Sequence, residues 1–280
     1  MISTHTRWMR RVGVAIGVIA LFAGTMVVLL PLVEMFFTAF KPSSEINAFP
    51  PMLFPESWTL ANFERIFTDL PLARLLLNSV IFAGGVAIIA VAFDSMAAYA
   101  LARIDFTGRR VVLILIILGL MIPFQATLVP LYRLVSDLGW VDTYLGLIVP
   151  RAADAFGIFF LRQFFLSLPR DLDNAARIDG ASEWRIFSSV VLPNTIPAVL
   201  TLGVFHFVNN WNDLLWPLVF TTKPEMGTVT SGLTLLTGPA GIIPHGVMMA
   251  GSLISVIPLV VAYIIVQRRF IESIATTGLK

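Results

Sequence analysis

The chain has 280 residues, of which 57% are apolar and 13% are charged, and its formal net charge is +2. Soluble domains carry about 25% charged residues, so this composition indicates a membrane protein. The small net charge gives no indication of nucleic-acid binding, and the absence of cysteine excludes disulfides, thiolate catalysis and cysteine-based metal sites.

Six long apolar runs follow one another along the chain. A hydrocarbon core about 30 Å thick takes about 20 apolar residues per helix, and continuous runs favour helices over the alternating strands of a barrel. The first run is longer than a signal-peptide core, so we interpret it as an uncleaved helix. We predict an all-α polytopic fold, a single transmembrane domain over residues 1–280, with spans at residues 12–33, 75–102, 111–129, 144–165, 196–220 and 246–267.

The basic residues are distributed unevenly between the two sides of these spans. Thirteen of the 19 Lys and Arg residues fall on one side and five on the other, with Arg151 just inside a span. Because Lys and Arg are retained in the cytoplasm, we predict that both termini and the polar segment 169–193 are cytoplasmic.

Segment 169–193 has the features of two short helices joined by a turn. Asp171 or Asp173 is expected to cap the first helix, and Ser182 the second. Gly180 is expected to end the first helix in the left-handed conformation.

Three residues of this segment, Ile178, Trp184 and Phe187, are expected to form an apolar face. A face without a partner in so small a loop suggests docking on another protein. The alternative is a solvated loop whose aromatic residues lie on the membrane surface.

The spacing of residues in this segment resembles that of a known family. The pattern E-A-A, three residues, G, nine residues and I-x-L-P is kept from position 174 to Pro193, with Asn174 where the family usually has Glu. It is similar to the cytoplasmic loop through which permease subunits of ATP-driven (ABC) importers bind their ATPase. The resemblance implies an ATPase-coupling role for Asn174, Ala175, Ala176, Asp179, Gly180, Ala181, Trp184, Phe187 and Pro193.

The resemblance extends over most of the chain. The segments 37–42, 60–63, 159–165, 211–213 and 267–280 are similar to carbohydrate-importer permeases of the maltose-transporter (MalG-like) type, whose members are binding-protein-dependent transport system inner membrane components. It implies a MetI-like permease fold in a bacterial inner (plasma) membrane. It also implies contact of the tail residues Gly278 and Lys280 with the ATPase.

The implied partners are one homologous permease, two copies of a cytoplasmic ATPase and an extracytoplasmic solute-binding protein. The implied substrate is a di- or oligosaccharide, or a related polyol or glycerophosphate. The chain has no G-x-x-x-x-G-K-[ST] loop, so we expect it to be a transport subunit and not an enzyme. ATP and Mg would be bound by the partner ATPase, and no cofactor or metal is expected in this chain; His5, His206 and His245 lie far apart in the sequence.

Polar residues inside the predicted spans are candidates for a substrate cavity, because such residues usually face a bundle interior or water. The candidates are His206, Asn209, Asn210, Trp211, Asn212 and Asp213 in the fifth span, and Gln125 in the third. Amides and a carboxylate beside indole rings suit a carbohydrate. The alternative places Trp211 and Trp216 in an aromatic belt and the amides between helices.

Three further polar groups have structural interpretations. Arg151 and Asp154 are expected to form an i,i+3 pair on one helix, with substrate contact as the alternative. Asp94 is expected to be a helix-packing partner, with a neutral buried acid or a cavity group as alternatives. Pro123 is expected to bend the third span beside Gln125. This bend either faces a cavity or is a consequence of helix geometry alone.

Two other functional classes compete with the importer. A membrane-embedded, lipid-linked sugar transferase would use acidic residues near one interface, for which Asp171, Asp173 and Asp179 are candidates. Asp171 and Asp173 are two positions apart, however, and point away from each other on a helix. A proton- or sodium-coupled carrier would need an inverted repeat, which the sequence does not show.

Overall fold

The computed structural model describes residues 4–236 and 244–277, and all the regular elements in these ranges are helices. The chain forms two compact units. Unit 1 comprises Met1–Leu70 and Leu236–Ile254, and unit 2 comprises Pro71–Leu235 and Ser255–Lys280. Gly278 and Lys280, the predicted tail contacts, lie outside the described residues.

Unit 1 contains the N-terminal helix and the segment that follows it. Its elements are α1 (Thr4–Ala39), α2 (Ser43–Ile46), α3 (Ala61–Asp69) and the first turns of α15 (His245–Thr277). The buried side chain of Asn62 holds α3 against the end of α1. Its amide nitrogen donates to the backbone oxygens of Ala39, at 3.0 Å, and Lys41, at 2.8 Å.

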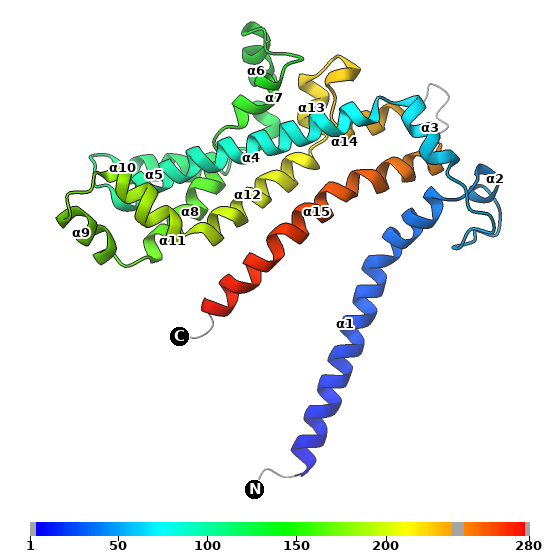
Figure 1. Cartoon of the computed structure of the whole chain (residues 1–280), viewed down its shortest axis with the longest axis horizontal. Coiled ribbons are helices and arrows are strands. Elements are labelled where there is room, and N and C mark those ends of the chain that lie inside the picture. Colours follow the sequence, from blue (N-terminus) through cyan, green and yellow to red (C-terminus); the bar gives the residue numbers. More distant parts are fainter. Residues whose placement is uncertain (1–3, 237–243, 278–280) are drawn as a thin grey trace. The chain divides into compact units, whose positions relative to one another are not determined.

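Unit 2 is built around one long helix, α4 (Leu72–Arg103), which packs along its length against α8 (Ala155–Ser167) and α12 (Ile196–Trp211) (Figure 1). Small side chains on α4 form these contacts, among them the fully buried Ala98 and Ala102. Small residues let helix backbones approach closely, and in a membrane this packing is what holds helices together.

The remaining elements of unit 2 are shorter. They are α5 (Arg109–Gly119), α6 (Phe124–Asp137), α7 (Tyr144–Ile148), η1 (Val149–Arg151), α9 (Asp171–Ile178), α10 (Glu183–Ile186), η2 (Phe187–Val191), α11 (Leu192–Asn194), α13 (Leu215–Phe220), η3 (Pro224–Met226), α14 (Val229–Leu233) and η4 (Thr234–Leu236). The element η2 is a turn of π-helix, while η1, η3 and η4 are 3₁₀ turns.

The described helices provide the six spans that the hydropathy predicts only if bent helices are included. Three segments are long and apolar enough to cross a membrane unbroken: Gly13–Ala39, Leu72–Arg103 and His245–Ile265. Three further candidates are bent pairs: α5 with α6 at 100°, α7 and η1 with α8 at 45°, and the segment Glu183–Asn194 with α12 at 81°.

The bend in the third predicted span lies where the sequence places it. Helix α5 ends at Gly119, and α6 begins directly after Pro123, which has extended backbone angles. Proline fixes its own backbone and has no N–H to continue a helix, so the break follows from its position. Gln125 lies exposed in the first turn of α6.

Candidate functional site

The 169–193 loop contains the two helices that its sequence predicts, α9 and α10. Gly180 has a φ of +78°. The N–H of Ala181 donates to the oxygen of Ala176 and the N–H of Gly180 to that of Arg177, both at 3.0 Å. These two bonds form a Schellman motif, which confirms the predicted left-handed stop.

The two helix starts differ in how they are capped. The Ser182 hydroxyl accepts from the backbone N–H of Arg185 at 3.4 Å, as predicted. The expectation that Asp171 or Asp173 caps α9 is wrong, because Arg170 occupies the cap position and its side chain makes no capping bond. Asp173 turns inward instead, and its carboxylate lies 3.1 Å from Nη1 of Arg103.

The exposed apolar face of the loop is smaller than predicted. Ile178 is 87% exposed and Trp184 is 64% exposed, but Phe187 is only 6% exposed. Phe187, the first residue of η2, faces inward, and its ring lies 5.2 Å from that of Tyr99. It therefore belongs to the core, and of the three predicted residues only Ile178 and Trp184 form an exposed apolar face.

The other predicted coupling residues lie at the surface or next to the core. Ala176 and Ala181 are half-buried and pack against the apolar cluster beneath the loop. The remaining ones are exposed: Asn174, Ala175, Asp179, Gly180 and Pro193. The loop thus presents a rigid backbone turn with small side chains next to two large apolar ones.

A carboxylate links the two loop helices to each other. Glu183 at the start of α10 accepts from Nε of Arg177 on α9, at 2.9 Å, and from the Tyr99 hydroxyl, at 2.7 Å. The hydrogen bond from Arg177, followed by that from Tyr99, lowers the pKa of Glu183, and the same bond raises the pKa of Arg177. The pair is therefore ionised at neutral pH.

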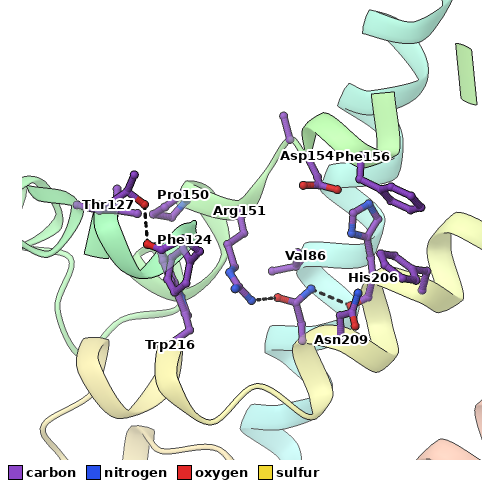
Figure 2. A pocket seen from close by; sticks show the side chains of 14 residues that line it. Val86, Phe124, Thr127, Pro150, Arg151, Asp154, Phe156, His206, Asn209 and Trp216 are labelled. Atoms are coloured by element: carbon purple, nitrogen blue, oxygen red, sulfur yellow. Dashed lines mark hydrogen bonds between the residues drawn. The ribbon is translucent and has the colours of Figure 1, made fainter. Parts of the chain in front are cut away.

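A cavity of about 500 Å³ lies among α4, α6, η1, α8 and α12 of unit 2. Figure 2 shows Arg151 beside Trp216 on one side of this cavity, with His206, Asp154 and Phe156 on the other. Amide, imidazole, guanidinium and aromatic groups line the same space, which gives the cavity both polar donors and apolar faces.

Three of the seven predicted cavity residues line this space: His206, Asn209 and Asn210. Trp211 is buried, and its indole N–H donates to the Ser255 oxygen at 3.1 Å. Trp216 is fully buried in unit 2 and lines the cavity. Asp213 does not line the cavity but forms an ion pair with Arg151, which does. Asn212 and Gln125 are exposed and do not line it.

The expected pairing of Arg151 with Asp154 is wrong, because the helix breaks between them. Nη1 of Arg151 lies 2.7 Å from Oδ2 of Asp213 and donates to Oδ1 of Asn210. Its guanidinium lies over the ring of Trp216, 4.8 Å from the centroid. Asp154 instead caps α8 by accepting from the Gly157 N–H at 3.1 Å.

Asp94 on α4 is a helix-packing partner, as predicted. Its Oδ2 lies 3.1 Å from Nε2 of His206, and its Oδ1 accepts from the backbone N–H of Asp154 at 2.8 Å. Both side chains are buried. The contact joins α4, α8 and α12 at one wall of the cavity. In the described part of the chain, no three metal-ligating side chains lie close enough together to hold a metal ion.

Comparison with known proteins identifies the family. Residues 94–275 match the family described as "Binding-protein-dependent transport system inner membrane component". The chain belongs to this family. Its members are membrane transport components, so this result favours the importer over the sugar transferase and the ion-coupled carrier.

Curated relatives span nearly the whole chain. The permease AraQ of the arabinooligosaccharides transport system of Halalkalibacterium halodurans is 36% identical over 98% of this chain and 96% of its own length. The permease NgcG of the diacetylchitobiose uptake system of Streptomyces coelicolor is 33% identical over 93% and 87%. The permease UgpE of the sn-glycerol-3-phosphate system of Brucella abortus is 32% identical over 96% and 98%.

Solved structures share the fold. A bacterial ABC transporter involved in the import of the acidic polysaccharide alginate contains a chain with a TM-score of 0.81 and 24% identity, covering 96% of this chain and 99% of that one. A bacterial alginate ABC transporter in complex with its alginate pentasaccharide-bound periplasmic protein gives a TM-score of 0.65, at 16% identity and over 94% and 96% of the two chains. The family match, with these structures, places the chain in the MetI-like permease fold.

The contact between Asp94 and His206 depends on Gly157, and this can be tested. A Cβ at position 157 would collide with Oδ2 of Asp94 and lie 3.2 Å from Nε2 of His206. Such crowding costs about 1–3 kcal/mol, so we expect Gly157→Ala to lower the thermal unfolding midpoint in detergent.

Gly84 on α4 is the matched control, because a Cβ there meets nothing within 4 Å. Gly84→Ala should raise the midpoint slightly, since replacing glycine by alanine inside a helix gains about 0.5–1 kcal/mol. If both variants behave alike, the close approach of α8 to α4 at Gly157 is wrong.

Proposed function

We propose that this chain is one of two homologous permeases in an ATP-driven, binding-protein-dependent importer of a neutral di- or oligosaccharide. It would lie in a bacterial inner membrane as a multi-pass protein with both termini in the cytoplasm. Two copies of a cytoplasmic ATPase would bind ATP and Mg and dock on the 169–193 loop, with the C-terminal tail beside them. A solute-binding protein would deliver substrate from outside. The curated relatives are named for such systems.

The observation that carries this proposal is the geometry of the 169–193 loop. A Schellman motif fixes the turn between two short helices. Two large apolar side chains, Ile178 and Trp184, are exposed beside this turn. Exposed apolar residues of this size next to a backbone fixed by hydrogen bonds fit a docking face for another protein. The ATPase, when it closes on ATP, would push on this face.

The charge balance of the cavity favours a neutral sugar over a glycerophosphate. The guanidinium of Arg151 is already bound by the carboxylate of Asp213 and the amide oxygen of Asn210. An anionic substrate would have to displace Asp213, which would then lie unpaired in a low-dielectric site. Hydroxyl groups can bind the exposed amide of Asn209 without that cost, and the Phe156 ring offers an apolar face.

The experiment that tests the proposal is purification of the tagged protein in mild detergent, with the co-eluting chains identified by mass spectrometry. We expect an ATPase, a homologous permease and a solute-binding protein. The binding protein is then screened against neutral oligosaccharides and glycerol 3-phosphate. Recovery of this chain alone would contradict the importer, and binding of glycerol 3-phosphate alone would contradict the neutral substrate.

Gly180→Val tests the loop directly. A β-branched residue is strained at positive φ, so the turn between α9 and α10 should distort and present the wrong surface. We expect the complex to insert in the membrane and uptake to be abolished. The control is Gly108→Val, which places the same strain in the turn between α4 and α5, where φ is +86°. Equal uptake by the two variants would contradict a special role of the loop.

Asn209→Ala tests the cavity. Asn209 lines the cavity and is exposed, so its loss should leave the fold intact. A hydrogen bond is worth about 0.5–1.5 kcal/mol. The substrate concentration for half-maximal uptake, measured with a saturating ATPase and binding protein, should therefore rise about two- to ten-fold.

The matched control for the cavity is Asn212→Ala, since Asn212 is an exposed amide of the same segment that does not line the cavity. Uptake by this variant should be unchanged. If the two variants have the same uptake kinetics, this cavity is not where substrate binds.

A further inference from the structure

Helix α4 ends in a buried arginine that binds the first loop helix. The Arg103 side chain is 2% exposed and its Nη1 lies 3.1 Å from Oδ2 of Asp173 on α9. Its Nη2 donates to the oxygen of Leu168 at 2.8 Å and also to that of Phe165, at the end of α8. The Phe165 oxygen also accepts from the Leu168 N–H at 3.3 Å, and the guanidinium adds a second donor there. One guanidinium therefore joins the ends of α4 and α8 to α9.

One turn earlier on the same helix, Tyr99 binds the second loop helix. Its hydroxyl donates to Oε2 of Glu183 on α10 at 2.7 Å, and Oε1 of Glu183 accepts from Arg177 on α9. The ring of Tyr99 packs on Phe187 of η2. Each loop helix therefore has its own polar contact with α4, and Glu183 also links α10 to α9 through Arg177.

The same helix reaches the cavity without a break. From Arg103 the described helix runs back to Leu72, past Asp94, which binds His206 and the start of α8. Val86, further along, lines the cavity. A continuous helix that is fixed to the loop at one end and to the cavity wall at its middle can carry a displacement between them.

Stability alone does not account for the tie between Arg103 and Asp173. A buried ion pair contributes little net stability, because removing both charges from water costs as much as their attraction returns. In addition, Nε of Arg103 is buried without a hydrogen-bond partner among the described residues. Such a pair is better explained by the geometry it enforces.

We propose that Tyr99 and Arg103 are the positioning residues that transmit movement of the 169–193 loop to the cavity through α4. The inference rests on the proposed function, because it assigns to α4 the link between the ATPase contact and the translocation path. When an ATPase displaces α9 and α10, the contacts of Arg103 with Asp173 and of Tyr99 with Glu183 move the end of α4 with them. The contacts of Asp94 then transmit this movement to α8 and α12.

The test uses the complete complex, with its partner permease, ATPase and binding protein, reconstituted in lipid vesicles. Tyr99→Phe removes one hydroxyl and keeps the ring against Phe187. The double variant Arg103→Gln/Asp173→Asn removes both charges together, so that no buried charge is left alone. Matched controls are Tyr132→Phe, whose ring packs on Phe220, and Arg65→Gln/Asp69→Asn, an exposed ion pair.

The quantity measured is the solute transported per ATP hydrolysed, beside the rate of hydrolysis that the loaded binding protein stimulates. We expect both test variants to assemble and hydrolyse ATP, and their transport per ATP to fall about three-fold or more, as for residues along a coupling network. The two controls should keep the wild-type ratio. A residue that only supports the fold would lower complex yield, hydrolysis and transport together.

The outcomes separate the two proposals. An unchanged ratio in both test variants, or a proportional fall of hydrolysis and transport, would overturn the transmission role. If the double variant does not assemble, the ratio in Tyr99→Phe decides. Absence of an ATPase from the wild-type complex would contradict the proposed function itself, and with it the transmission.

Discussion

The polar side chains of α4 must find partners inside an apolar bundle, and the arrangement of unit 2 follows from the partners they find. An unpaired polar group in such an interior costs several kcal/mol. Near one end, Asn78 donates to the oxygens of Glu225 and Gly227, both at 2.8 Å, and accepts from Tyr144. At the middle, Asp94 binds α8 and α12. At the other end, the last two turns bind the 169–193 loop.

The same constraint explains where the cavity lies. Broken helices free backbone groups that need partners, and such breaks are tolerated in a membrane only where protein or water satisfies them. Asp154 supplies the partner at the break before α8, and Asp213 accepts from the N–H of Trp216 at the break after α12. Arg151 then balances the charge of Asp213. The polar groups that satisfy the two breaks therefore lie close together, and the cavity lies beside them.

Local chemistry allowed much of the loop to be predicted from the sequence. The left-handed stop at Gly180 and the Ser182 cap depend on neighbours within a few residues, so spacing alone predicts them. The bend at Pro123 is equally local. The spacing of the loop also pointed to the family, and the comparisons identified that family independently of the structure.

Two predictions that depended on distant partners failed. Arg151 and Asp154 were paired on the assumption of one unbroken helix, but Arg151 binds Asp213 instead. Phe187 has the right spacing for an exposed face, yet its ring packs against Tyr99 of α4 and it is only 6% exposed.

The hydrogen bond of Tyr99 with Glu183 and the ion pair of Arg103 with Asp173 join residues 84 and 70 positions apart in the sequence. No local pattern signals them. Their only sequence signal is an Arg and a Tyr one turn apart at the end of an apolar span, next to a loop that carries acids.

The central claim is that the 169–193 loop is the contact with the ATPase, and site-specific photo-crosslinking in intact membranes tests it most directly. A photoreactive residue replaces Ile178, which is 87% exposed on the loop, or Phe93, which is 50% exposed on α4. The account predicts an adduct with an ATPase from position 178 and none from position 93. An ATPase that co-purifies but forms no adduct from position 178, or that reacts equally with position 93, would contradict it.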